Sequence, residues 1–381
     1  MANIEVEEVA KGKGIPLREL HVKVGEAHFI APTRSLAYSE YRPSNETVLA
    51  SEHSVIEVFR RITADKLASI RHNPEEKDKE IGKWLRHVRK SKSTGGTVFF
   101  ILKIEGENID KASAKFLADT ISKLGADIVS TPITLDHNPA AYAKFIEAFN
   151  EEFKSTTYGA KTEVAYTVPP NILKNHKATQ KLLETYSKKK PTILLVDYNG
   201  SNPFSTTYTS STKRLHTWKT SKLEKALGQL SITYGINIKP KSRKYPLPAR
   251  DLATLFLDFN ILGSNHIPLK LPKEVIEKIK ETYKPKLLNI GTYGYLRMDE
   301  AKDQIPEEYT PKITLNMVQQ YSELYKVFNA ERQLIETRHI IDLIEKEEDL
   351  KKYIKSKEHL DNKAKKIILN YHTPPLESII K

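Results

Sequence analysis

The chain has 381 residues, with 61 Lys and Arg against 48 Asp and Glu, a formal net charge of +13 and no cysteine. The lack of cysteine excludes a disulfide scaffold, an iron–sulfur cluster, a thiolate zinc site and a cysteine nucleophile. Hydrophobic residues make up 39%, which suffices for a core in a chain of this length. The positive charge favours a polyanionic partner, most simply nucleic acid, and the alternative is a lysine-rich surface without a partner.

Membrane association is not expected. No apolar run has the length that crosses a bilayer, and the opening residues MANIEVEEVAKGKG lack the apolar segment of a signal peptide. We therefore expect a soluble, cytoplasmic protein. The sequence has no Gly-rich dinucleotide or P-loop motif, no H-E-x-x-H and no nucleophile elbow, so neither a cofactor nor a metal is predicted.

The first 96 residues begin with predicted β structure and continue as helix. Residues 21–32 alternate in character and contain Gly25 and Pro32, which is typical of a hairpin. Residues 52–92 have helical character with many charges and end before Gly95 and Gly96. One further strand in the region 50–60 is the alternative for the start of this segment.

A regular alternation of strands and helices starts at residue 97. Apolar strands are predicted over residues 97–105, 127–135, 163–168, 192–198, 231–238, 260–267 and 286–293. Helices are predicted between them over residues 111–124, 140–153, 177–188, 222–227, 248–259 and 272–283. Such continuous apolar strands, separated by amphipathic helices, indicate a parallel sheet covered by helices.

We therefore predict an α/β fold, a TIM-like (β/α)8 barrel with an N-terminal β extension and a C-terminal helical segment. The seven strands above and one from the region 50–60 give the eight that the barrel requires. A doubly wound open sheet is the alternative. Because the pattern becomes purely helical after Pro311, residues 1–311 are expected to form the barrel with its hairpin and residues 312–381 the helical segment.

Polar residues at the predicted carboxyl ends of the strands are the candidates for chemistry, because the active face of such a barrel lies there. Asp136 and Asp197 are the candidate catalytic carboxylates, although Asp136 also suits a helix cap and Asp197 a turn. The candidate substrate-pocket residues are His137, Asn199, Ser264, Asn265 and His266. The histidines have no third ligand near them in sequence, which disfavours a zinc site.

A second pattern is a basic loop that follows the strand 231–238. Residues 239–246, KPKSRKYP, place four cations and one tyrosine between two prolines, an arrangement suited to phosphate contacts. The candidate nucleic-acid-binding residues are Lys239, Lys241, Arg243, Lys244 and Arg297. The run RHVRKSK at residues 86–92 extends the positive charge, and a solvated helix face without a partner is the alternative.

Several segments, taken in order, resemble the tRNA-guanine transglycosylase family, particularly its archaeal branch. Residues 25–38, GEAHFIAPTRSLAY, are similar to its N-terminal hairpin, and residues 124–142, LGADIVSTPITLDHNPAAY, to its G-x-D-I strand and following loop. Residues 248–265, PARDLATLFLDFNILGSN, resemble the helix and strand that carry the family's nucleophilic aspartate. Residues 290–306 and 313–336 resemble its G-T-x-x-L segment and its closing helix.

The resemblance implies a (β/α)8 barrel that binds tRNA and exchanges guanine for a 7-deazaguanine through a covalent aspartyl–ribose intermediate. The family's nucleophile aligns with Gly263, which has no side chain, while Ser264 is retained. Its Q-G-G loop aligns with Pro169 and Pro170, and its cysteine zinc motif is absent. The resemblance therefore supports the (β/α)8 barrel but argues against the family's base-exchange reaction.

Three functions remain open from the sequence. The leading one is a catalytically degenerate, transglycosylase-like protein that binds tRNA or another nucleic acid, as a homodimer or as the partner of a catalytic paralogue. The second is an active pentosyltransferase with rearranged carboxylates, in which Asp136 or Asp197 attacks and Asp258 is a further candidate. The third is a non-enzymatic subunit that docks on a larger assembly through residues 336–368.

Overall fold

The computed structural model describes residues 4–41, 49–51, 53–268, 272, 274–275, 285–305 and 311–371. Within these ranges, none of the helices combines the length and the apolar character that crossing a membrane requires. The predicted helix 272–283 lies almost entirely outside the described residues, as does the end of the C-terminal segment after Tyr371.

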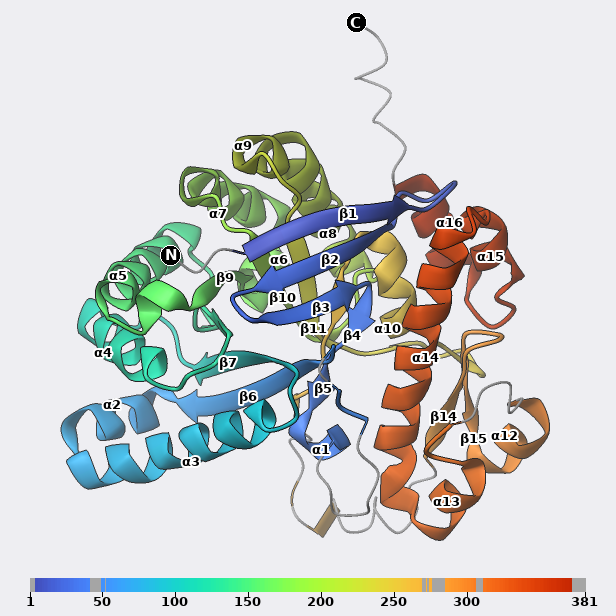
Figure 1. Ribbon diagram of the computed structural model, residues 1–381, viewed down its shortest axis with the longest axis horizontal. Coiled ribbons are helices and arrows are strands. Elements are labelled where there is room, and N and C mark those ends of the chain that lie inside the picture. The colour runs from blue at the N-terminus through green and yellow to red at the C-terminus, as the bar shows by residue number, and fades with distance from the viewer. Residues whose placement is uncertain are drawn as a thin grey trace, which may run out of the picture.

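The chain begins with a three-stranded antiparallel sheet (Figure 1). Its strands are β1 (Ile4–Lys11), β2 (Arg18–Val24) and β3 (Ala27–Ala31). Strands β2 and β3 form the predicted hairpin, and Gly25 takes a φ of +61° in its turn, a conformation that costs glycine little. Val22, Val24 and Phe29 pack against the first residues of the large sheet, so this N-terminal sheet covers the amino end of the parallel strands.

The large sheet has nine parallel strands and is nearly closed into a barrel. The strand order is β4-β13-β11-β10-β9-β8-β7-β6-β5. Its members are β4 (Thr33–Arg34), β5 (Leu36–Ala37), β6 (Val55–Thr63), β7 (Thr97–Glu105), β8 (Ile128–Ser130), β9 (Glu163–Val168), β10 (Ile193–Ser201), β11 (Ile232–Ile238) and β13 (Ile261–Leu262). Only Ser35 separates β4 from β5, and its N–H donates to Leu262 O at 2.8 Å.

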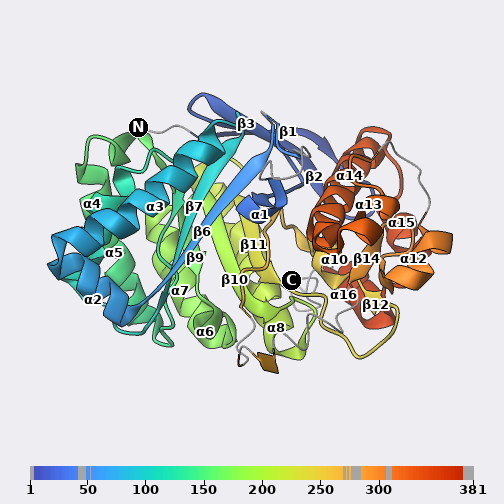
Figure 2. The same ribbon diagram turned by 90° about the horizontal axis from the view of Figure 1, so that it is seen from below.

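Helices cover the outer face of this sheet (Figure 2). They are α2 (Ala64–His72), α3 (Pro74–Lys92), α4 (Lys111–Ser122), α5 (Pro139–Ser155), α6 (Pro170–Leu173), α7 (His176–Lys189), α8 (Thr206–Trp218) and α9 (Glu224–Leu227), with a π-helical turn at Lys219–Leu223. Asparagine side chains cap three of these helices, at Asn73, Asn138 and Asn175. Each accepts hydrogen bonds from the first backbone N–H groups, which have no partner inside the helix.

The alternation of side chains along the strands places buried residues in two cores, one on each face of the large sheet. In β7, Phe100 and Leu102 face the helices, while Phe99 and Ile101 face the interior of the sheet together with Ile193 and other apolar residues. This alternation follows from the two-residue repeat of a strand. The interior is apolar at its amino end, where the N-terminal sheet closes it, and polar towards the carboxyl ends.

The last part of the chain builds a second layer beside the carboxyl ends (Figure 1). A small antiparallel sheet contains β12 (Leu247–Pro248), β15 (Gly294–Arg297) and β14 (Lys286–Asn289). The helices here are α1 (Tyr38–Tyr41), α10 (Arg250–Ala253), α12 (Met298–Gln304), α13 (Leu315–Gln320), α14 (Tyr325–Glu345), α15 (Leu350–Ser356) and α16 (Asn362–Tyr371), with 3-10 turns at Thr254–Leu257 and Ser322–Leu324. A further 3-10 turn, Gly159–Lys161, follows α5 in the layer of the large sheet. The segment 336–368 packs on this body, since Arg250 and Asp361 form an ion pair at 2.8 Å.

The α/β class is confirmed, and the structure differs from the predicted elements at several places. Residues 55–63 form β6, so the charged segment 52–92 is not one helix, and the strand expected in the region 50–60 is confirmed. The apolar segment 286–293 contributes β14 to the small antiparallel sheet. The predicted strand 260–267 shortens to two paired residues, and helix α8 occupies a stretch that its many hydroxyl residues left unassigned. The sequence could not assign the segment 286–293 to the antiparallel sheet, because antiparallel and parallel strands have the same apolar composition here.

The Glu163 carboxyl at the start of β9 provides a test of this packing. Burial raises the pKa of Glu163 to about 7, although Lys154 and the Val164 N–H oppose the rise. The folded protein therefore favours the protonated acid and loses stability as the pH rises from about 4.5 to about 7. We expect Glu163→Gln to raise the free energy of unfolding by about 1–3 kcal/mol at pH 8 and to have no such effect at pH 4. Urea unfolding at both values measures this, and an equal effect at the two values would contradict it.

Candidate functional site

Inward-facing polar residues form a layer near the carboxyl ends of the central strands. Lys103 of β7 and Asp197 of β10 follow apolar inward positions by two residues and are 4% and 0% exposed. The Lys103 Nζ donates to Asp197 Oδ2 at 2.8 Å and to Asn199 Oδ1 at 3.1 Å. Asn237 of β11 donates to the other Asp197 oxygen at 2.8 Å. Each buried charge therefore has an opposite charge and further hydrogen bonds, as burial requires.

A second buried carboxylate, Glu57 of β6, lies beside this layer. It accepts hydrogen bonds from Ser35, at 3.0 Å, and from Tyr234, and it pairs with His266 Nε2. The His266 ring stacks on Phe59 with 4.1 Å between the ring centroids. Burial alone would raise the pKa of Glu57, but His266, Tyr234 and Arg34 hold it below its usual range. Glu57 is therefore an anion fixed by its neighbours.

The Glu57 carboxylate lies close to Gly263, the position discussed above for its lack of a side chain. A Cβ atom built on Gly263 would come within 2.7 Å of Glu57 Oε2 and 2.5 Å of a methyl group of Ile236. Real Cβ atoms do not approach neighbours so closely. The site therefore has no room for a side chain at position 263, and the carboxylate nearest to it comes from a different strand.

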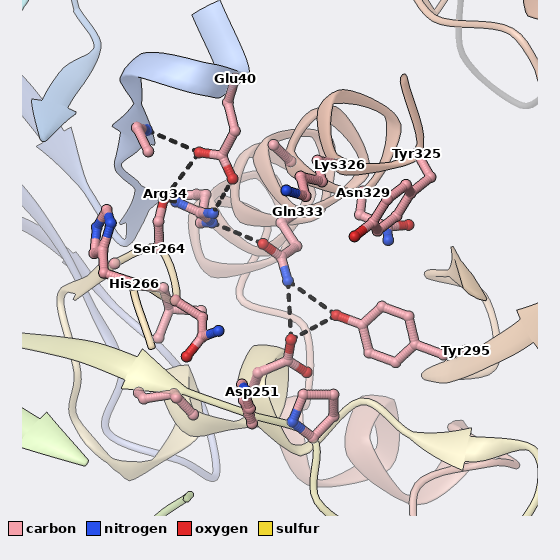
Figure 3. Close-up of a pocket in the computed structure, with 18 of the residues that line it drawn as sticks. Arg34, Glu40, Asp251, Ser264, His266, Tyr295, Tyr325, Lys326, Asn329 and Gln333 are labelled. Atoms are coloured by element: carbon pink, nitrogen blue, oxygen red, sulfur yellow. Dashed lines mark hydrogen bonds and ion pairs between the residues drawn. The ribbon is translucent and has the colours of Figure 1, made fainter. Parts of the chain in front are cut away.

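A cavity of about 380 Å³ opens at the carboxyl ends of β4, β11 and β13 (Figure 3). Its walls come from the ends of these strands, from α1 and α10, and from α14 and the small sheet. The residues labelled in the close-up are Arg34, Glu40, Asp251, Ser264, His266, Tyr295, Tyr325, Lys326, Asn329 and Gln333. The position agrees with the place where parallel barrels bind ligands.

Arg34 organises one side of this cavity. Its guanidinium donates to Glu40 Oε1 at 2.8 Å and to Ser264 Oγ at 3.0 Å, and its Nε donates to Gln333 Oε1 at 2.7 Å. Glu40 also accepts from Ser264 and from the Ala37 N–H, at 2.9 and 2.8 Å. The ion pair is buried on both sides. It fixes the residues after β4 and β13 against α14.

Asp251 occupies the other side. Its Oδ2 accepts a 2.5 Å hydrogen bond from the Tyr295 hydroxyl and a 3.2 Å bond from Gln333 Nε2. Burial raises the pKa of the Asp251 carboxyl above its usual range, although the Tyr295 hydroxyl opposes the rise. Its Oδ1 is buried and makes no hydrogen bond to another described side chain. Gln333 thus joins the Arg34 and Asp251 sides of the cavity (Figure 3).

The predicted pocket residues separate into two groups. Ser264, Asn265 and His266 line the cavity. The His137 side chain is 66% exposed and pairs with Glu107 at 3.4 Å, while Asn199 is exposed beside Lys103. Neither of these two residues is part of the cavity wall.

The three candidate carboxylates lie outside the cavity wall. Asp136 is 3% exposed and accepts from the Asn108 N–H at 2.9 Å and from Thr134 at 2.6 Å, so it joins two loops, while Asn138 is the helix cap. Asp197 is held in the ion pair with Lys103. Asp258 lies in the helical layer and accepts from His216 and Lys219, each at 2.9 Å.

The basic loop, residues 239–246, runs from the cavity to the surface. Lys239 lines the cavity, and Lys241, Arg243 and Lys244 are exposed. Tyr245 anchors the loop, because its hydroxyl accepts from the Arg297 N–H at 3.0 Å and the Arg297 guanidinium lies 4.8 Å from its ring centroid. The five predicted basic residues thus lie on one loop and on the strand β15 that holds it.

Sequence reasoning missed Arg34, Glu40, Glu57, Asp251 and Gln333. Glu57 was detectable, because it is the charged residue at an inward position of the apolar run VIEVF. Arg34 and Gln333 are 299 residues apart in sequence, and no local pattern joins them. No group of three or more potential ligands that would hold a metal ion occurs in the described ranges.

Comparisons with known proteins add no family to this description. No protein-family model matches the chain, and no curated protein matches it either.

Proposed function

We propose that the chain is a transglycosylase-like (β/α)8 barrel that binds tRNA or another nucleic acid and does not exchange bases. Counting β4 and β5 as one strand around Ser35 gives eight parallel strands, which supports the barrel. The cavity at their carboxyl ends and the basic loop beside it support a nucleic-acid ligand.

The observation that carries the proposal is the crowded position of Gly263. A covalent base exchange needs a carboxylate that reaches the sugar carbon. Position 263 supplies none, and the nearby Glu57 carboxylate has no exposed surface and is held by Ser35, Tyr234 and His266. Asp136 and Asp197 are likewise engaged in buried contacts away from the cavity. The arrangement favours binding over the standard reaction.

Neutralising the basic loop tests the nucleic-acid interface. We expect the triple variant Lys241→Ala/Arg243→Ala/Lys244→Ala to weaken tRNA binding at low salt without changing the fold. Each lost phosphate contact removes about one unit from the slope of log affinity against log salt, so the slope should fall by about 3. Fluorescence anisotropy over a salt series measures both quantities.

The matched control removes the same charge from the surface of α7 and α9. Lys181, Lys188 and Lys225 are exposed there, and neither helix contributes to the cavity wall. Their triple alanine variant should bind with nearly the wild-type slope. If both triple variants lost the same tRNA affinity, the effect would come from net charge and not from the loop. Undetectable tRNA binding by the wild type would refute the proposed function.

A further inference from the structure

The basic run at residues 86–92 ends helix α3 and lies beside α1, away from the cavity. Figures 1 and 2 both place α1 between α3 and α14. Glu40 of α1 lines the cavity, whereas the Tyr38 ring stacks on His87 of α3 with 4.8 Å between the ring centroids. Helix α1 therefore has one side on the cavity and another on a basic surface that the proposed function does not use.

Arg60 of β6 is a cation without a partner behind this surface. It lies on the helix-covered face of the sheet, because Val58 and Ile62, two residues to either side, belong to that core. Its Nε and Nη2 atoms are closed off from solvent and make no hydrogen bond to any part of the chain that the structure describes. Burial lowers the pKa of Arg60, although Glu80 and Tyr41 oppose the fall. Because arginine stays protonated in proteins, this guanidinium is a charged group with unmade hydrogen bonds.

Two cations of α3 join it in what we call the α3 cation cluster: Arg60, Arg86 and Lys90. The Lys90 Nζ lies 5.3 Å from the centroid of the Tyr38 ring, and Arg86 is exposed. Burial and the charges of the three cluster residues together hold the pKa of His87 below its ordinary value. All three cations are thus close to one imidazole, and they repel one another there.

No carboxylate within the described ranges neutralises the cluster. Lys83 and Lys92, on the same helix, do form ion pairs, with Glu80 at 3.0 Å and with Asp127. The Glu80 charge reaches the cluster, but its two oxygens are engaged by Lys83 and, at 3.1 Å, by Trp84 Nε1. The free protein therefore leaves this concentration of positive charge without a counter-ion of its own.

A phosphate group matches both the charge and the unmade hydrogen bonds. The guanidinium N–H groups lie in one plane and bind two phosphate oxygens at once, while an ammonium group adds a point charge. Buried donors without acceptors cost free energy, and an oxyanion removes that cost. Arg60 is half-buried as a whole residue, which leaves it within reach of an anion at the surface. A single carboxylate would leave most of the charge of three cations uncompensated.

We propose that the α3 cation cluster binds one phosphate group, with Arg60 as the central donor and with Arg86 and Lys90 at its rim. This inference deepens the proposed function and rests on it for the nucleic acid whose backbone carries the phosphate. The site would hold that backbone on the far side of α1 from the cavity. The same chemistry comes from two sources, a phosphodiester of a nucleic acid and a free phosphate ion.

Arg60→Met tests the central donor, because it removes the charge and keeps a side chain of similar length. We expect tRNA binding at low salt to weaken about tenfold and the slope of log affinity against log salt to fall by about 1. The urea midpoint of the free protein should stay the same or rise, since an uncompensated charge is lost. A merely structural Arg60 would lower that midpoint. Anisotropy and urea unfolding measure the two responses, and wild-type affinity in the folded variant would overturn the proposal.

Arg86→Ala/Lys90→Ala tests the rim, and both residues are exposed, so the variant should fold like the wild type. We expect the salt slope to fall by about 2. The matched control is Lys181→Ala/Lys188→Ala on α7, which removes the same charge from an exposed face elsewhere and should keep nearly the wild-type slope. Equal slopes in the two double variants would assign the effect to net charge and would overturn the rim.

Inorganic phosphate serves as the probe for the free ion. Thermal unfolding is compared in phosphate and in chloride at matched ionic strength. We expect phosphate to raise the unfolding midpoint of the wild type, because it binds the folded chain, and to raise that of Arg60→Met clearly less. An equal rise in both proteins would place the bound phosphate elsewhere and would count against the site.

The two sets of measurements separate the sources and the two proposals. tRNA binding that depends on Arg60, without stabilisation by inorganic phosphate, supports a phosphodiester of nucleic acid as the ligand. Phosphate stabilisation that depends on Arg60, without any tRNA binding, supports a free phosphate and refutes the proposed function. tRNA binding that depends on the basic loop, but on none of the cluster residues, refutes the α3 site and leaves the proposed function standing.

Discussion

Gly263→Asp, which introduces a carboxylate at the position that we propose to correspond to the transglycosylase nucleophile, is expected to destabilise the protein and to produce no base exchange. The new Cβ would lie 2.5 Å from an Ile236 methyl group and 2.7 Å from Glu57 Oε2. Overpacking and a second carboxylate next to Glu57 together should lower the free energy of unfolding by roughly 2–5 kcal/mol. Urea unfolding measures the stability, and labelled guanine incorporation measures the reaction.

Two controls isolate the crowded position. Asn265→Asp adds the same charge two residues further along, at an exposed site, and should change the stability by less than about 0.5 kcal/mol. Adding Glu57→Ala to Gly263→Asp removes the neighbouring carboxylate and should recover part of the loss. Wild-type stability in Gly263→Asp would show that the position accepts a side chain, and the structural argument against the nucleophile would then fail.

Arg34→Met is expected to lower the free energy of unfolding by about 3–5 kcal/mol, because it leaves the buried Glu40 carboxylate without its counter-ion. The ion pair is 2.8 Å long, and the exposed fractions of its side chains are 7% and 10%. The Arg34 guanidinium also holds Ser264 and Gln333, so the cavity wall loses two further hydrogen bonds. Denaturant unfolding at neutral pH gives the magnitude.

The double variant Arg34→Met/Glu40→Gln distinguishes lost charge balance from lost packing. With the carboxylate neutralised, most of the stability should return, so the double variant should be more stable than Arg34→Met alone. Arg297→Met removes an exposed guanidinium and should cost less than about 0.5 kcal/mol. A double variant as unstable as Arg34→Met would assign the effect to packing.

The repeating part of the fold was predictable from the sequence, since apolar strands such as residues 97–105 and 193–198 alternate with helices of the expected periodicity. The two short strands that complete the sheet were not. The strands β4 and β5 contain two residues each, and their role depends on pairing with β6 and with β13, which lies far along the chain. Strands this short carry no periodic signal.

The candidate site was likewise predictable only in part. Ser264, Asn265 and His266 were identified because they lie at the carboxyl end of a predicted strand, and a strand end has a defined place in a parallel sheet. Asp251 and Gln333 come from helices whose orientation depends on tertiary packing. Asp136 and Asp197 had the right position in sequence, but their hydrogen bonds to Asn108 and Lys103 are visible only in three dimensions.

Guanine exchange and tRNA binding, measured on one preparation of the full chain, decide between a binding protein and an enzyme. Labelled guanine is offered with tRNA at the low ionic strength at which anisotropy shows the complex. We predict salt-sensitive tRNA binding with no incorporation above the protein-free reaction. Incorporation that depends on the protein would contradict the absence of a nucleophile at Gly263, and a lack of binding at every ionic strength would contradict the nucleic-acid interface.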